Sequence, residues 1–169
     1  DPIGIWVACA MTTDEDKLRA LRREIDAIDD SLHDLIIERT RVVERVREAK
    51  KGDKIKIRPA REAEILYRLM ARHSGTFPKR ELSRMWREMI IATLRFEGPF
   101  SVSVFVSEDD VGYGDLARDQ YGSFTPMTRH VSSRAVIEAV SSGEATVGIL
   151  PMPRPDDSVH WWRLLVTEV

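Results

Sequence analysis

Apolar residues recur at spacings of three, four or seven over the first third of the chain. Charged and polar residues fill the positions between them, and no Gly or Pro interrupts the pattern from Asp16 to Lys51. The apolar residues are Leu18, Leu21, Ile25, Ile28, Leu32, Leu35, Val42 and Val46. This pattern predicts one amphipathic helix of about 35 residues. Because that exceeds the usual globular helix, we expect its apolar stripe to pack against a partner's copy.

Two shorter helices are predicted to follow. Pro59 suits the first turn of the second helix, which should close at His73-Ser74-Gly75, and Pro78 should open the third. Their apolar faces comprise Ile65, Leu66, Leu69 and Met70, and then Leu82, Met85, Trp86, Met89, Ile90 and Leu94. Three helices of such unequal length cannot bury the outer half of the first. We therefore predict an all-α three-helix domain that forms an intertwined dimer.

After Pro99 the pattern changes to the alternation of a strand over 101–106. We then expect a helix over 114–120, a strand over 125–129, a helix over 132–140 capped by Ser132 or Ser133, and a strand over 145–150. This β-α-β-α-β order predicts a small, mostly parallel α/β unit. Residues 153–157 should form a turn or loop, and Trp161 should begin a last helical or extended piece.

Composition and charge divide the chain at one point. Residues 14–97 contain 21 Lys and Arg against 17 Asp and Glu, whereas residues 98–169 contain 5 against 10. The change falls near Gly98-Pro99, where a helix would also stop. We predict a leader over 1–13 that is disordered or foreign to the fold, a helical domain over 14–98 and an α/β half-lobe over 99–169.

Several classes of function are disfavoured. The net charge of −2 argues against a nucleic-acid partner, and no apolar run approaches the roughly 20 residues of a membrane helix. Cys9 is the single cysteine, so a reducing, cytoplasmic setting without disulfides is expected. We find no metal-ligand spacing among the four histidines, no serine or cysteine nucleophile with a histidine base, and no phosphate-binding glycine loop. We therefore expect no cofactor, and catalysis, if any, by holding and polarising a substrate.

Three cations on the long helix suggest a binding site. Arg39 and Lys50 are 11 residues apart, which places them on one face about 16 Å apart along the axis. Arg22 lies about 25 Å from Arg39 and roughly 100° off that face, so it suits the pocket of a partner chain. This geometry indicates a shared site for a small, doubly negative molecule.

The two shorter helices add further polar groups. Arg61 and Glu62 start the second helix, and Thr93 and Glu97 stand at i and i+4 near the end of the third. Cations, a carboxylic acid and a hydroxyl together suit a polyanion that carries a hydroxyl group.

These residues occur in runs that resemble a known family. The runs are Leu21–Asp29, Glu38-Arg39, Ala49-Lys50, Arg61–Leu66, Trp86–Ile90 and Leu94–Glu97. In this order and spacing they resemble the all-helical chorismate mutases over about residues 16–97. The resemblance implies a homodimer that converts chorismate to prephenate in phenylalanine and tyrosine biosynthesis.

The resemblance also implies individual roles. Arg22 would reach across the dimer to one substrate carboxylate, and Arg39 would bind the other in its own chain. Lys50 would donate to the ether oxygen, and Glu62, with Arg61 beside it, would accept the ring hydroxyl.

The remaining positions are less uniform. Thr93 stands where the family often has Ser, and Glu97 where it has Gln or Glu. Arg58 stands where many members have Asp, which removes one expected side-chain contact to the hydroxyl side of the substrate. Glu97 can donate to the ether oxygen only when protonated, so we expect burial to raise its pKa and to favour activity at acid pH.

The C-terminal segment carries a second resemblance. Ser132–Val140 and Gly143–Pro151 resemble the first lobe of a prephenate dehydratase domain. Ser107–Asp110 replaces the expected glycine-rich opening, and neither the second lobe nor its Thr-Arg-Phe signature occurs, so these residues cannot assemble a dehydratase site. The segment is either a degenerate lobe or part of a longer natural protein.

Two other functions remain open. A lyase of the same fold that removes pyruvate from isochorismate would need the same anion-binding groups. A non-catalytic helical dimer whose α/β tail senses an aromatic amino acid would also fit. Charged residues on a long helix are often only a solvated face, a reading that suits the single residues better than the ordered set.

Overall fold

The computed structural model describes residues 13–50, 57–107, 112–155 and 160–168. The predicted leader, except for Thr13, and the predicted end of the long helix at Lys51 lie outside these residues. Contacts within the chain define two compact units, Asp1–Lys50 and Lys51–Val169, which we describe separately.

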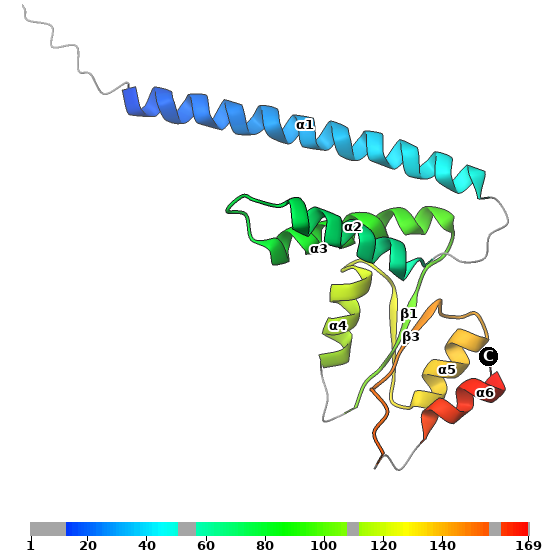
Figure 1. Ribbon diagram of the computed structural model, residues 1–169. Coiled ribbons are helices and arrows are strands. Elements are labelled where there is room, and N and C mark those ends of the chain that lie inside the picture. The colour runs from blue at the N-terminus through cyan, green and yellow to red at the C-terminus, as the bar shows by residue number, and fades with distance from the viewer. Residues whose placement is uncertain (1–12, 51–56, 108–111, 156–159, 169) are drawn as a thin grey trace, which may run out of the picture. The chain divides into compact units, whose positions relative to one another are not determined.

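The described part of the first unit consists of helix α1, which runs without a break over Thr13–Ala49, and of Lys50 after it (Figure 1). The predicted long helix is confirmed and begins three residues before Asp16. Asp14, Glu15 and Asp16 in its first turn and Arg47 in its last turn complement the helix dipole. No residue of α1 is buried, and its apolar stripe is open: exposed fractions run from 42% at Val46 to 60% at Leu35.

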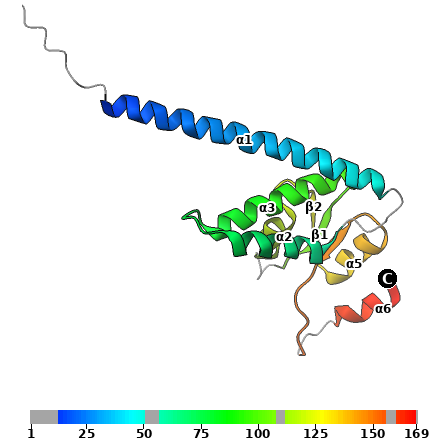
Figure 2. The same cartoon turned by 45° about the horizontal axis from the view of Figure 1, so that its top comes forward.

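The second unit begins with two helices that lie side by side in both views, α2 (Pro59–Arg72) and α3 (Lys79–Leu94) (Figures 1 and 2). Pro59 occupies the first helical turn as predicted. Between α2 and α3, Nε2 of His73 forms a hydrogen bond with the carbonyl oxygen of Phe77 at 2.7 Å. A 3₁₀ turn, η1 (Arg95–Glu97), follows α3 and ends at Gly98, whose φ of 130° favours glycine.

The predicted α/β unit is confirmed. Strands β1 (Val102–Phe105), β2 (Met127–His130) and β3 (Val147–Ile149) form a parallel sheet in the order β2-β1-β3. Helices α4 (Gly112–Tyr121) and α5 (Ser133–Ser141) connect the strands, and a 3₁₀ turn η2 (Trp161–Leu164) leads into α6 (Leu165–Glu168).

The strand order explains where the helices lie. The crossover through α4 moves one way from β1, and the crossover through α5 moves back past β1 to the other edge. Right-handed crossovers in opposite directions place the helices on opposite faces of a sheet. Figure 1 shows this arrangement, with α4 on one side of the strands and α5 and α6 on the other.

The hydrophobic core of the second unit crosses the predicted boundary at Gly98-Pro99. Ile91 and Leu94 of α3 are buried together with Phe100, Val102, Val104 and Ala117. The end of α3 is therefore packed into the α/β segment, although composition and charge change there. The predicted domain limits at residues 13 and 98 stay a prediction.

Candidate active site

Two of the three cations predicted from the first unit lie on α1, and the third follows its last residue. Arg22 and Arg39 lie within α1, and Lys50 follows it directly in a turn where its N–H donates to Arg47 O at 3.1 Å. The helical spacing used to predict their faces therefore holds up to Ala49. Burial lowers the pKa of Arg39, which nevertheless stays charged at neutral pH because a guanidinium group does not lose its proton in proteins.

The residues predicted from α2 differ in exposure. Arg58 occupies the N-cap position, and Arg61 in the first turn forms an exposed ion pair with Glu64 at 3.1 Å. Glu62, the residue after Arg61, is partly buried. Adjacent positions on a helix point in different directions, about 100° apart, which is why Arg61 and Glu62 can meet different surroundings.

Glu62 interacts electrostatically with residues of two other helices. Desolvation by burial raises the pKa of its carboxyl group, and the charge of Arg87 from α3 partly opposes that rise. Burial, followed by the charge of Glu62, raises the pKa of Tyr121 at the end of α4. A carboxylate, a guanidinium and a phenol from three helices thus influence one another.

Thr93 lies in the buried end of α3. Its hydroxyl donates to the carbonyl oxygens of Ile90 at 2.9 Å and Met89 at 3.1 Å, so its proton is engaged while its lone pairs remain able to accept. Glu97 lies in η1, beyond the last α-helical residue, Leu94. The shared face predicted for Thr93 and Glu97 assumed that the α-helix reaches Glu97. The α-helix ends at Leu94, and the 3₁₀ turn that follows has a different period.

Arg87 and Tyr121 received no role in the sequence-based prediction. A signal for Arg87 exists in the pattern, since it stands four and seven residues before the buried Ile91 and Leu94 and so shares their face. A cation on an apolar face requires a partner. The proximity of Tyr121 to Glu62 depends on how α4 packs, and no local pattern carries it.

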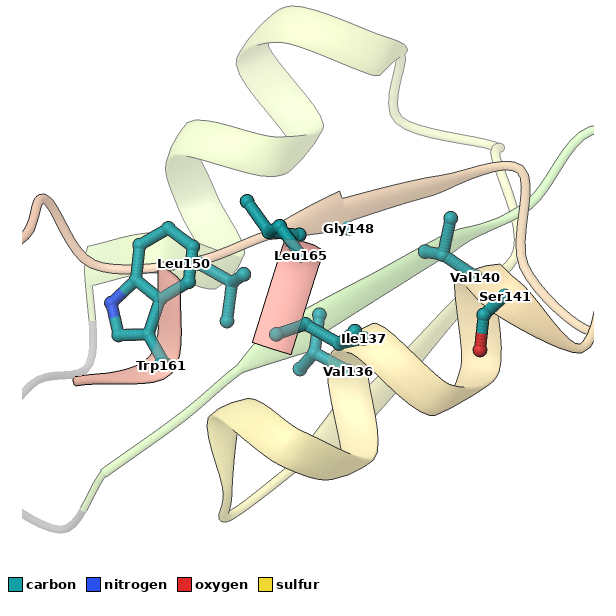
Figure 3. Close-up of a pocket in the computed structure, with 8 residues that line it drawn as sticks. All are labelled: Val136, Ile137, Val140, Ser141, Gly148, Leu150, Trp161 and Leu165. Atoms are coloured by element: carbon teal, nitrogen blue, oxygen red, sulfur yellow. The ribbon is translucent and has the colours of Figure 1, made fainter. Parts of the chain in front are cut away.

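A separate cavity lies in the α/β segment. It has a volume of about 700 Å³ and is bounded by α5, β3 with its following residues, η2 and α6 (Figure 3). The residues that line it are Val136, Ile137, Val140, Ser141, Gly148, Leu150, Trp161 and Leu165. None of them is charged, so this cavity does not suit a dianion.

No cluster of three or more His, Cys, Asp or Glu side chains within the described residues has a metal-binding arrangement. No helix in the described part of the chain has the length and apolar character needed to cross a membrane.

Residues 21–98 match the family Chorismate mutase type II. This segment takes in most of α1 together with α2, α3 and η1, and it contains every predicted site residue. The resemblance predicted from the sequence runs is confirmed.

Full-length relatives extend the match beyond the helices. The bifunctional chorismate mutase/prephenate dehydratase of Pseudomonas aeruginosa is 29% identical over 145 residues, 82% of this chain and 40% of its own length. The protein of the same description from Aquifex aeolicus is 28% identical over 149 residues, 85% of this chain and 41% of its own. Alignments of this length must include much of the α/β segment, and the chain spans about two fifths of these relatives.

Proposed function

We propose that this chain is a chorismate mutase that acts as a homodimer in the biosynthesis of phenylalanine and tyrosine. The match of residues 21–98 to a chorismate mutase family is the observation that carries this proposal. The unbroken α1, which carries Arg22 and Arg39 and is followed directly by Lys50, supports it. A cytoplasmic location belongs to the same proposal and rests on the single cysteine.

The dimer is proposed because of the open stripe on α1. Eight apolar side chains of this stripe are 42% to 60% exposed along one face of a helix that buries no residue. A second copy of the same helix would cover that face, since isologous packing brings identical stripes together. Arg22 would then serve the pocket that contains the partner's Lys50.

The proposed chemistry is a rearrangement that needs no acid, base or cofactor. Arg22 and Arg39 bind the two carboxylates of chorismate and confine its compact, diaxial conformer, a positioning effect worth several kcal/mol. Glu62 accepts a hydrogen bond from the ring hydroxyl, with Arg61 beside it, and Arg58 and Thr93 are further substrate-binding positions. Lys50 and protonated Glu97 donate to the ether oxygen, where negative charge grows as the bond breaks.

Lys50→Ala tests the proposal. The wild type should consume chorismate and form prephenate, and the variant should lose at least about a hundredfold in kcat, because removal of one preorganised donor costs that much. Lys17→Ala is the matched control, since it removes an exposed lysine of α1 that forms an ion pair with Asp14 at 3.8 Å.

The product decides between the open alternatives. Release of pyruvate from isochorismate, without prephenate from chorismate, would establish the lyase. Stabilisation by phenylalanine, tyrosine or tryptophan in a thermal shift, without turnover of either substrate, would establish the sensor.

A further inference from the structure

The turn that follows α4 is hydrogen-bonded to a side chain of α3. Oε1 of Glu88 accepts hydrogen bonds from the backbone N–H of Ser123 at 3.0 Å and from its hydroxyl at 2.8 Å. One helical turn earlier on the same face of α3, Arg84 forms an ion pair with Asp119 of α4 at 2.9 Å. The end of α4 and the turn after it are therefore bonded to α3 at two successive positions of one face.

The backbone of this turn also approaches α3 closely. Gly122 has a φ of 87°, and a Cβ there would lie 3.0 Å from Glu88 Oε2 and 3.2 Å from Ile91 Cγ2. Both distances are shorter than ordinary contacts, so glycine allows the approach as well as the backbone conformation. Ile91 is 3% exposed and shares its core with Phe100 and β1. Close packing and polar bonds together hold α3 on the α/β segment.

Thr93 lies on a different face of the same helix. It follows Ile91 by two residues, which places it about 200° around the helix axis. Its hydroxyl donates to the carbonyl oxygens of Met89 and Ile90, the two residues after Glu88. Because α3 contacts α2 as well as α4, a displacement of α3 on α4 would also move Thr93 relative to α2. The contact with Ser123 and the hydroxyl of Thr93 are thus connected through one short stretch of helix.

We propose that the turn after α4 positions α3 in the mutase site, so that the hydroxyl of Thr93 can form a hydrogen bond with the substrate. Gly122 and Ser123 act through their contacts with Glu88. All three are positioning residues, because none of them touches the substrate. This inference rests on the proposed function, in which Thr93 is a substrate-binding position, and it gives the α/β segment a purpose that needs no dehydratase activity.

The geometry of hydrogen bonds explains why the position of α3 matters. A donor and an acceptor that are 3.6 Å apart no longer form a hydrogen bond, so a shift of α3 by about 1 Å is enough to remove one. Loss of a single hydrogen bond of this kind weakens binding by about two- to tenfold. A bond that holds the substrate and the transition state equally well affects KM rather than kcat.

The test compares substitutions that break or keep the contact. Glu88→Ala removes the acceptor of both bonds, whereas Glu88→Gln keeps an amide oxygen in its place. We expect Glu88→Ala to raise KM for chorismate by about two- to tenfold with a smaller effect on kcat. Glu88→Gln should restore KM to within about twofold of the wild-type value.

Gly148→Ala is the control for a general loss of stability. Its Cβ would meet Val136 Cγ1 at 2.9 Å, in the contact between β3 and α5. All variants are assayed well below their thermal midpoints, and this one should keep the wild-type KM. An unchanged KM in Glu88→Ala, or an equal rise in Gly148→Ala, would overturn the inference, while turnover by the wild type would leave the mutase proposal standing.

A double-mutant cycle shows whether the effect of Glu88 passes through Thr93. Thr93→Val removes the hydroxyl and keeps a branched side chain of similar size. Glu88→Ala should raise KM in the wild-type background but add nothing in the Thr93→Val background, because the bond that it disturbs is already absent. Effects that multiply in the double variant would show that the two residues act independently and would overturn the inference.

A further readout needs no turnover. The ¹H–¹³C NMR signal of the Thr93 methyl group is assigned by its loss in Thr93→Val. Glu88→Ala should shift this signal, and Glu88→Gln and Gly148→Ala should leave it in place. A signal that stays unmoved in Glu88→Ala would contradict the inference even if chorismate is turned over. A shifted signal in a protein without turnover would support the link from Glu88 to Thr93 and count against the mutase proposal instead.

Discussion

The partly buried carboxyl group of Glu62 should make the stability of the fold depend on pH. Its pKa is raised in the folded protein, mainly by desolvation, against an ordinary value of about 4.3 for the unfolded chain. The folded state therefore binds this proton more tightly than the unfolded state. The contribution of the group to stability is largest below the unfolded pKa and is lost as the pH rises through the folded pKa.

Replacement of Glu62 should show this dependence directly. In Glu62→Gln the group no longer titrates, so the variant should gain stability relative to wild type between about pH 4 and pH 7. Urea denaturation of both proteins at the two pH values measures the difference. Glu64→Gln is the control, because it removes an exposed glutamate of the same helix that pairs with Arg61 at the surface. A stability difference that is equal at both pH values would contradict the assignment.

The sequence predicts which residues share a face of one helix, but it does not predict contacts between residues of different helices. The faces of Arg22 and Arg39 follow from the period of α1 alone, and the structure keeps that period over 37 residues. The pairing of Arg87 with Gln120 joins residues 33 positions apart and requires the packing of α3 on α4. Side-chain partners of that kind are decided by tertiary contacts that a local pattern does not contain.

The elements were predicted well in kind and less well in extent. A strand was expected from Thr125, but its N–H donates to the carbonyl oxygen of Gly122 at 3.4 Å, its hydroxyl donates to that of Tyr121, and β2 begins only at Met127. A strand was expected from Ala145, whose N–H instead donates to Ala139 O in the turn before β3. Local hydrogen bonds at the ends of α4 and α5 thus shorten both strands, because the backbone groups involved are already bonded outside the sheet.

A substitution on the apolar stripe of α1 tests the proposed dimer. Ile28 lies mid-stripe and is 53% exposed, so Ile28→Asp would bury a charge only if a partner covers the stripe. The thermal midpoint of the wild type should rise with protein concentration, and this variant should lose both that dependence and the dimer.

The control for this substitution lies on the opposite face of the same helix. Asp30 is about 200° around from Ile28, so Asp30→Ala should leave the dimer intact. Sedimentation measures the oligomeric state of all three proteins. A dimer that persists in Ile28→Asp would show that another surface joins the chains.

The contact between β3 and α5 gives a second prediction for an element. A Cβ added at Gly148 would lie 2.9 Å from Val136 Cγ1 and 3.2 Å from Val140 Cγ2, closer than side chains normally approach. Gly148→Ala should therefore destabilise the second unit by about 1–3 kcal/mol through overpacking.

Denaturant unfolding measures this effect, and a second glycine provides the comparison. Gly75→Ala is matched because its Cβ would meet only His73 Cε1 at 3.6 Å, an ordinary contact. This control should change stability by no more than about 0.5 kcal/mol. Equal effects of the two substitutions would argue that strand β3 can move away from α5 freely.

At the scale of the whole molecule, the core and the composition divide the chain differently. The charge balance changes at Gly98-Pro99, whereas Ile91 and Leu94 before that point are buried with Phe100 and Val102 after it. The charge balance of a segment reflects mainly its surface side chains, whereas the core is formed by buried apolar side chains, so the two need not divide the chain at the same residue. Glu62 accordingly interacts electrostatically with residues from both sides of the composition change, Arg87 before it and Tyr121 after it.

The cross-chain role of Arg22 belongs to the assembled molecule and can be tested by mixing subunits. Arg22→Ala and Lys50→Ala dimers should each be nearly inactive, because both of their pockets lack one cation. A hybrid dimer pairs the intact Lys50 of one chain with the intact Arg22 of the other, so one of its two pockets is complete. Statistical exchange should therefore restore about a quarter of wild-type activity.

The control mixture uses two residues that the proposal places in the same chain of one pocket. Mixing Arg39→Ala with Lys50→Ala should restore no activity, because each pocket of the hybrid still lacks one of the two cations. Subunit exchange is verified by mass spectrometry of the intact dimers in both mixtures. If exchange is complete and the Arg22→Ala mixture stays inactive, or if both mixtures recover equally, Arg22 does not act across the interface.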